Sequence, residues 1–162
     1  MDYTDRRPLP NLAATQRITR VANNRLGAVY TALYSFWVAR HAAMNQGAPQ
    51  NRRDAYSTIL FNSSPVEIYG NDFNSTPDQL IDRLLQQRAG GGTNFDAALV
   101  KANELMTRFW SPERYDHILG DTWRGLFSDL SRSPVIIFLS DGECSMTDAK
   151  MYDLCRNAVR LG

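Results

Sequence analysis

Residues 134–139, PVIIFL, form an unbroken apolar run. Such a run is typical of a strand that is buried on both faces of a parallel sheet. The polar residues SDGE follow directly at 140–143. Because layered α/β sheets bind ligands at the carboxyl ends of their strands, the sequence predicts that SDGE lies at a ligand-binding edge.

Three segments upstream support an α/β arrangement. Apolar residues at helical spacing predict an amphipathic helix over residues 26–41. The stretch AYSTILFN at 55–62 alternates with strand period, and a turn leads from it into VEIY at 66–69. Two strands joined so tightly form an antiparallel hairpin.

A helix start signal follows the hairpin. Thr76 can act as N-cap, Pro77 occupies the first helical position and Gln79 can complete a capping box. We expect the glycines at 90–92 to end this helix. Its predicted buried stripe consists of Leu80, Ile81, Leu84 and Leu85.

Two more helices are predicted, one starting at Asn94 and one over residues 147–162. We expect residues 1–25 to be an irregular N-terminal insertion and residues 111–133 to be an ordered insertion with a short helix around Leu126. The inward face of the last helix is predicted to contain Met151, Leu154, Cys155, Ala158 and Val159.

Length and composition indicate one domain over residues 1–162, with 43% hydrophobic and 22% charged residues. The formal net charge of +1 gives no support for a nucleic-acid or membrane surface. The two cysteines make no disulfide framework, and no apolar run is long enough for a membrane span or a signal peptide. The expected setting is therefore cytoplasmic or nuclear.

The glycine-rich stretch GGGTNFD at 90–96 precedes a predicted helix. Glycines before a helix let the backbone approach an anion closely. A nucleotide-binding P-loop would follow a strand and contain a lysine. This stretch follows a predicted helix and contains no lysine. The remaining structural explanation is that the glycines only connect two helices.

GGTNFDAAL and IIFLSDGE together resemble a von Willebrand factor A (VWFA) domain, in which they would be the second and third parts of a metal-ion-dependent adhesion site. The resemblance covers nearly the whole chain. It implies a three-layer α/β/α Rossmann-like fold, with a mostly parallel sheet and one antiparallel hairpin.

The resemblance also implies a ligand set. Thr93 and Asp141 would contribute oxygens to Mg²⁺ or another divalent cation. The loops of the site would be formed by Gly91, Gly92, Asn94, Ser140, Gly142 and Glu143. Capping a helix or facing solvent is an equally good explanation for Asn94, Asp96, Ser140 and Glu143.

In the family the motif D-x-S-x-S follows the first strand and precedes the first helix, and no such motif occurs before the helix predicted at 26–41. We interpret the chain as an incomplete VWFA domain that starts after this motif and stops after the helix that follows SDGE. The missing strand would lie between the strands at 55–61 and 134–139, and its loss would leave unpaired backbone edges and an exposed apolar face. We therefore expect marginal stability, and no tight Mg²⁺ binding by this chain alone.

The resulting functional hypothesis is a non-enzymatic protein-interaction module, whose partner completes the metal coordination with an acidic side chain. A cysteine-dependent hydrolase using Cys144 and His117 is one alternative. A nucleotide-binding switch domain is another, and it shares the fold class but lacks the P-loop.

Overall fold

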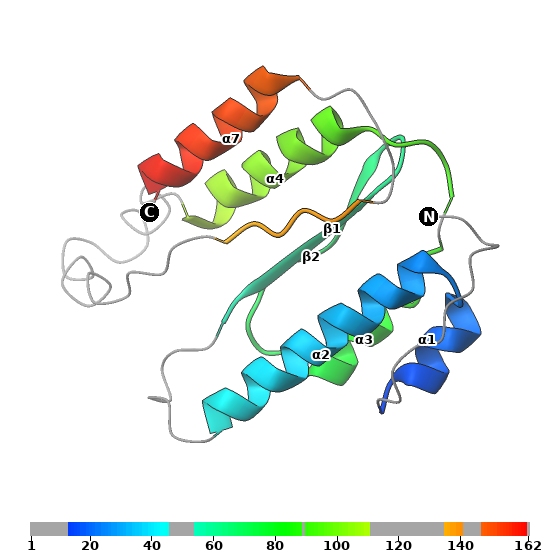
Figure 1. The fold of residues 1–162 in the computed structure, drawn as a ribbon. Coiled ribbons are helices and arrows are strands. Elements are labelled where there is room, and N and C mark those ends of the chain that lie inside the picture. The colour runs from blue at the N-terminus through cyan, green and yellow to red at the C-terminus, as the bar shows by residue number, and fades with distance from the viewer. Residues whose placement is uncertain (1–12, 46–53, 89, 111–134, 141–146, 162) are drawn as a thin grey trace. The chain divides into compact units, whose positions relative to one another are not determined.

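The structure of the chain is a computed structural model, which describes residues 13–45, 54–88, 90–110, 135–140 and 147–161. This described part is mixed α/β, with five helices and a two-stranded antiparallel sheet (Figure 1). The predicted α/β class is confirmed at this level. The chain divides into two compact units, of which the first comprises residues 1–58, 67–92 and 139–142 and the second 59–66, 93–138 and 143–162.

The first unit contains α1 (Thr15–Val21) in a region that we expected to be irregular, so that expectation is wrong for these residues. The sequence gives little warning of α1, because it is short and no side chain caps its start. The chain leaves α1 close to the start of the next helix. A Cβ atom on Gly27 would lie 1.8 Å from the carbonyl oxygen of Ala22, so only glycine fits there.

Helix α2 (Arg25–Asn45) begins where Asn24 caps it, since the Asn24 side-chain oxygen accepts a hydrogen bond from the Gly27 N–H at 3.3 Å. The helix continues past the predicted end at residue 41. Its inward stripe is aromatic, with Tyr30, Tyr34 and Trp37 buried. The helical spacing predicted from the sequence is confirmed.

Helix α3 (Pro77–Leu84) starts with the predicted capping box. The Thr76 hydroxyl accepts from the Gln79 N–H at 3.3 Å, and the Gln79 side chain accepts from the Thr76 N–H at 2.8 Å. Helix α3 packs against α2. Its buried residues are Pro77, Leu80, Ile81 and Leu84. The prediction that the glycines end α3 is wrong, because the helix stops at Leu84 and Leu85 is its half-buried C-cap.

The hairpin consists of β1 (Tyr56–Phe61) and β2 (Pro65–Asp72), as predicted, with β2 longer than expected. Within the first unit, the Trp37 ring of α2 contacts Tyr56 and Tyr69, with centroid distances of 6.1 and 6.3 Å. Such aromatic pairs stabilise a core beyond the area that they bury. Residues 59–66, which comprise the hairpin turn and the strand ends next to it, belong to the second unit.

In the second unit, α4 (Phe95–Trp110) and α7 (Asp148–Leu161) pack side by side (Figure 1). Leu99, Met106 and Leu154 form their shared core. None of the described helices is long and apolar enough to span a bilayer.

The inward face of α7 was predicted only in part. Leu154 is buried, and Met151 and Ala158 pack against the same core. Cys155 is an exposed free thiol and Val159 is also exposed, so both predictions are wrong. Among the described elements, α4 makes the extensive contact with α7, and it covers a narrower stripe than the apolar pattern suggests.

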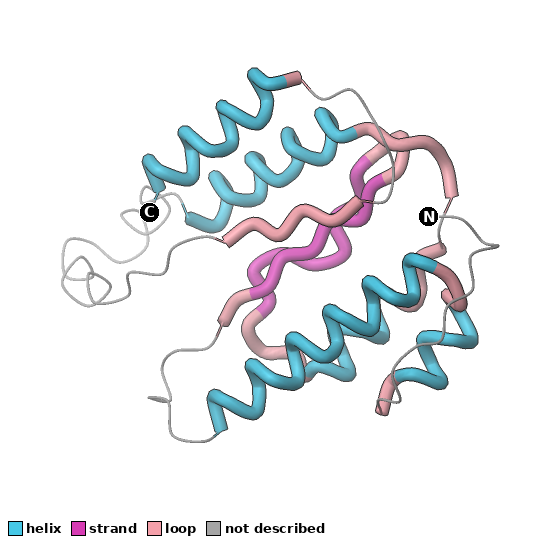
Figure 2. The backbone as a smooth tube through the Cα atoms, in the orientation of Figure 1, coloured by secondary structure: helices cyan, strands magenta, loops and turns pink. Residues whose placement is uncertain are grey.

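The buried strand predicted at 134–139 is wrong for residues 135–139. They form no strand, and their side chains are exposed. Figure 2 shows this stretch as loop. The physical reason is that β1 and β2 pair only with each other in the described part, so no ladder includes residues 135–139. The predicted insertion at 111–133 lies outside the described residues.

Candidate functional site

The start of α4 is held by Asn94. Its side-chain oxygen accepts a hydrogen bond from the Ala97 N–H at 3.0 Å, which is the geometry of an N-cap. Its backbone N–H donates to the carbonyl oxygen of Asn62 in the hairpin turn at 2.8 Å, and its side-chain amide donates to that of Ser63 at 3.5 Å. Asn94 therefore fixes the residue before it, Thr93, close to the hairpin turn.

Asp96 lies in the first turn of α4 and joins it to the start of α7. One carboxylate oxygen accepts from the Thr147 N–H at 3.0 Å, and the other accepts from the Thr147 hydroxyl at 2.5 Å. These hydrogen bonds, first that of the hydroxyl and then that of the N–H, hold the pKa of Asp96 below its ordinary value. Because both oxygens accept hydrogen bonds, Asp96 acts here as a cap for another helix.

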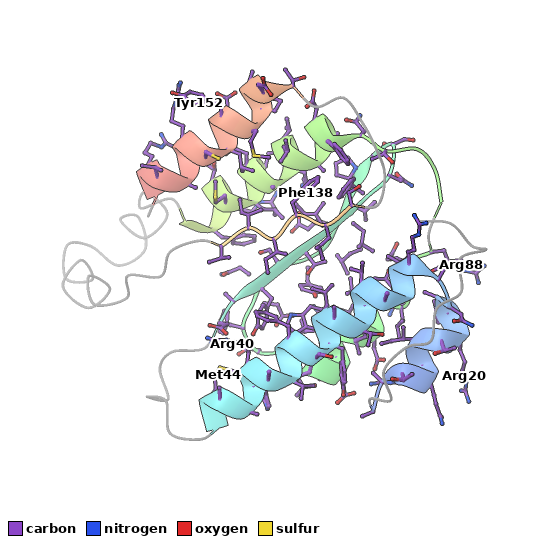
Figure 3. All side chains as sticks on the ribbon, viewed as in Figure 1. Arg20, Arg40, Met44, Arg88, Phe138 and Tyr152 are labelled. Atoms are coloured by element: carbon purple, nitrogen blue, oxygen red, sulfur yellow. The ribbon has the colours of Figure 1, made fainter. Side chains whose placement is uncertain are left out.

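Three phenylalanine rings meet at the same place. The Phe138 ring lies 5.3 Å from Phe95 in an edge-to-face arrangement and 5.3 Å from Phe61 in a stacked one, and Phe61 and Phe95 are 5.9 Å apart. Figure 3 labels Phe138, the member of this cluster that precedes SDGE in the sequence. The cluster attaches the end of residues 135–138 to the first turn of α4.

Phe138 and Thr147 therefore both contact the first turn of α4, through Phe95 and Asp96. They lie on either side of SDGE in the sequence. Neither contact was predicted from the sequence. The phenylalanines in the sequence could have suggested an aromatic cluster. No local sequence pattern indicates that Asp96 is the partner of Thr147.

The residues predicted for a metal site are placed only in part. Thr93 is exposed and directly precedes the N-cap of α4. Gly91 has a φ of 83°, a left-handed conformation that favours glycine, and Gly92 is exposed. Ser140 is exposed and belongs to neither a helix nor a strand. The remaining predicted residues, Asp141, Gly142 and Glu143, lie outside the described residues.

A divalent cation at this site would need several oxygen ligands. Mg²⁺ requires about six oxygen ligands and binds through carboxylates and water. Among the residues that the structure describes, no group of three or more His, Cys, Asp or Glu side chains could hold a metal ion.

Comparisons with known proteins identify no relative. No protein family model matches the chain, and no curated protein or solved structure is detectably similar to it.

Proposed function

We propose that this chain is a protein-interaction module of the VWFA type, with a partial metal-ion-dependent adhesion site. The observation that supports this best is the contact of Phe138 and Thr147 with the first turn of α4. These two residues flank SDGE, and the same turn follows Thr93. These contacts support the proposal that both motifs contribute to one site at the start of α4.

In this proposal Thr93 and Asp141 contribute a hydroxyl and a carboxylate oxygen to a divalent cation such as Mg²⁺. The left-handed backbone at Gly91 suits a loop that turns sharply before Thr93. Asn94 supports the site as a helix cap, and Gly92, Ser140, Gly142 and Glu143 surround it. Two side-chain oxygens leave most coordination positions to water, so binding is expected to be weak.

The partner in this proposal is a protein with an acidic side chain, whose carboxylate replaces a water on the cation. The helices and the antiparallel hairpin are compatible with the proposed three-layer α/β/α arrangement, of which this chain would form an incomplete part. Binding, rather than turnover, is the proposed activity.

The test uses Mn²⁺ as a paramagnetic substitute for Mg²⁺. Water-proton relaxation reports Mn²⁺ that is bound to the protein and still carries exchangeable water. We expect enhancement with the unmodified chain, its loss in Asp141→Ala and Thr93→Ala, and its recovery in Thr93→Ser, which restores a hydroxyl. Asp153→Ala removes an exposed carboxylate from α7 and is the matched control.

A second step tests the acidic partner. A short peptide with one aspartate should displace water from bound Mn²⁺ and reduce the enhancement, whereas the same peptide with asparagine should not. The metal site is refuted if Asp141→Ala and Asp153→Ala bind Mn²⁺ equally. The interaction mode is refuted if both peptides behave alike on a chain that binds Mn²⁺.

A further inference from the structure

Helices α4 and α7 run parallel (Figure 1), and polar contacts join them near both ends. Near their starts Thr147 donates to Asp96, 51 positions away in the sequence. Further along, Asn157 donates to Thr107, 50 positions away. A nearly constant difference at both ends is what two parallel helices in one fixed register produce, because each residue advances along either axis by about 1.5 Å.

The side-chain amide of Asn157 uses both its donors and its acceptor. Its nitrogen donates to the Asn103 side-chain oxygen at 2.6 Å and to the Thr107 hydroxyl at 2.8 Å. Its oxygen accepts from the Arg160 guanidinium at 3.0 Å. Asn103 and Thr107 are four residues apart on α4, so they are neighbours on one face of that helix. Asn157 thus spans one helical turn of α4.

The apolar contacts between α4 and α7 specify their register less sharply than this network does. They consist of leucine, methionine and alanine side chains, namely Leu99, Ala102, Met106, Met151, Leu154 and Ala158. Methionine is unbranched and flexible, so it adapts to several packing arrangements. The polar network, by contrast, requires particular atoms to lie opposite one another.

A shift of α7 by one helical turn, about 5.4 Å, would break this arrangement. Asn157 would then keep at most one of its two partners on α4, and Thr147 would move away from Asp96. Asn103 and Asn157 are half-buried, so an amide that lost its partner there would also lack part of its hydration. The observed register is therefore the one that satisfies both ends of the helix pair.

We propose that Asn157 selects the axial register of α7 on α4, and that it thereby holds Thr147 against Asp96. A single polar residue in a helix–helix contact has this role in coiled coils, where it excludes other registers at some cost in stability. The role of Asn157 is therefore to position α7. It follows from contacts within the second unit, and it does not depend on the proposed metal site.

Two nitroxide labels can report the register. Val100→Cys in α4 and Val159→Cys in α7 place them on exposed side chains, and Cys144→Ser and Cys155→Ser remove the native thiols. Val100 lies about one turn beyond Asp96, whereas Val159 lies about three turns beyond Thr147. Double electron–electron resonance between the labels therefore detects a one-turn shift as a displacement of about 5.4 Å along the helix axes.

The labelled chain with Asn157 should give a single distance. Asn157→Leu should add a second distance that corresponds to a one-turn shift, and its melting temperature should not fall, because leucine replaces the polar contact by an apolar one. Arg156→Leu is the control. It introduces the same side chain on α7 at an exposed residue that stacks on Tyr152 of the same helix, and it should keep the single distance.

A single unchanged distance in Asn157→Leu, or a second distance in both leucine variants, would overturn the proposal. Asn157→Ala removes the amide without adding bulk and should also show the second distance. If circular dichroism shows that Asn157→Ala does not fold, the network is needed for the helix pair to form at all. Asn157 would then not act by selecting between registers, which also overturns the proposal.

Discussion

Helix α3 and residues 135–139, here called the apolar segment, are both strongly apolar, yet only α3 has its apolar residues covered. Leu80, Ile81 and Leu84 are almost completely buried, whereas Ile137 is largely exposed. Both stretches were predicted to be buried. The difference lies in what each element needs from the rest of the chain.

A helix forms its backbone hydrogen bonds internally, so α3 needs a partner for one face only. That partner is α2, which belongs to the same unit and packs against it. A strand needs partners at its edges as well as on its faces. Apolar composition therefore predicts burial only when the elements that would cover a segment are present.

The largest expected effect is a matched truncation of two isoleucines. Ile81→Ala removes a fully buried side chain and should lower the free energy of unfolding by about 2–5 kcal/mol. Ile137→Ala removes an exposed side chain and should change the free energy of unfolding by less than ~0.5 kcal/mol. Urea denaturation followed by circular dichroism gives both values.

Equal losses for the two isoleucine variants would contradict the comparison, because Ile137 would then be buried in solution.

A smaller effect is expected from backbone packing within the first unit. Gly27→Ala would bring a methyl group against the carbonyl oxygen of Ala22 and should destabilise the unit by about 1–3 kcal/mol. Gly90→Ala is the control, because its Cβ would meet no atom within 4 Å. Thermal unfolding of both variants measures the difference, and an unchanged melting temperature of Gly27→Ala would show that α1 does not pack as described.

The sequence predicted elements whose signals are local. The capping box of Thr76 and Gln79 lies within one turn, and it was confirmed in detail. The hairpin and α2 were predicted from periodicity and also exist. The exposure of residues 135–139 was not predictable in this way, because burial of a segment depends on neighbours distant in the sequence.

The candidate site shows the same division. A positive φ at Gly91 and a cap at Asn94 follow from residue types that favour those roles. The contacts of Phe138 with Phe95 and of Thr147 with Asp96 join residues far apart in the chain. No periodicity or spacing encodes such pairs, so the link between the two motifs required the structure.

The smallest effect tests this long-range cap by its pH dependence. Asp96 has a pKa below its ordinary value because Thr147 donates two hydrogen bonds to it. Its contribution is therefore fully present above the pKa of an unfolded aspartate, about 3.9, and is lost as pH falls through the lower pKa of the folded state. The cap of α3 uses the hydroxyl of Thr76 and the amide of Gln79, so it carries no such dependence.

Melting temperatures from neutral pH to below about pH 4 should therefore fall less steeply in Asp96→Asn than in the unmodified chain. The asparagine keeps an acceptor for one Thr147 donor but cannot titrate. Asp153→Asn, on the exposed face of α7, should follow the unmodified profile. If Asp96→Asn and Asp153→Asn reduce the fall of the melting temperature at acid pH equally, the loss of one negative charge at any position accounts for the effect. In that case Asp96 does not join α4 to α7 in solution, and the proposed connection between the two motifs loses its main support.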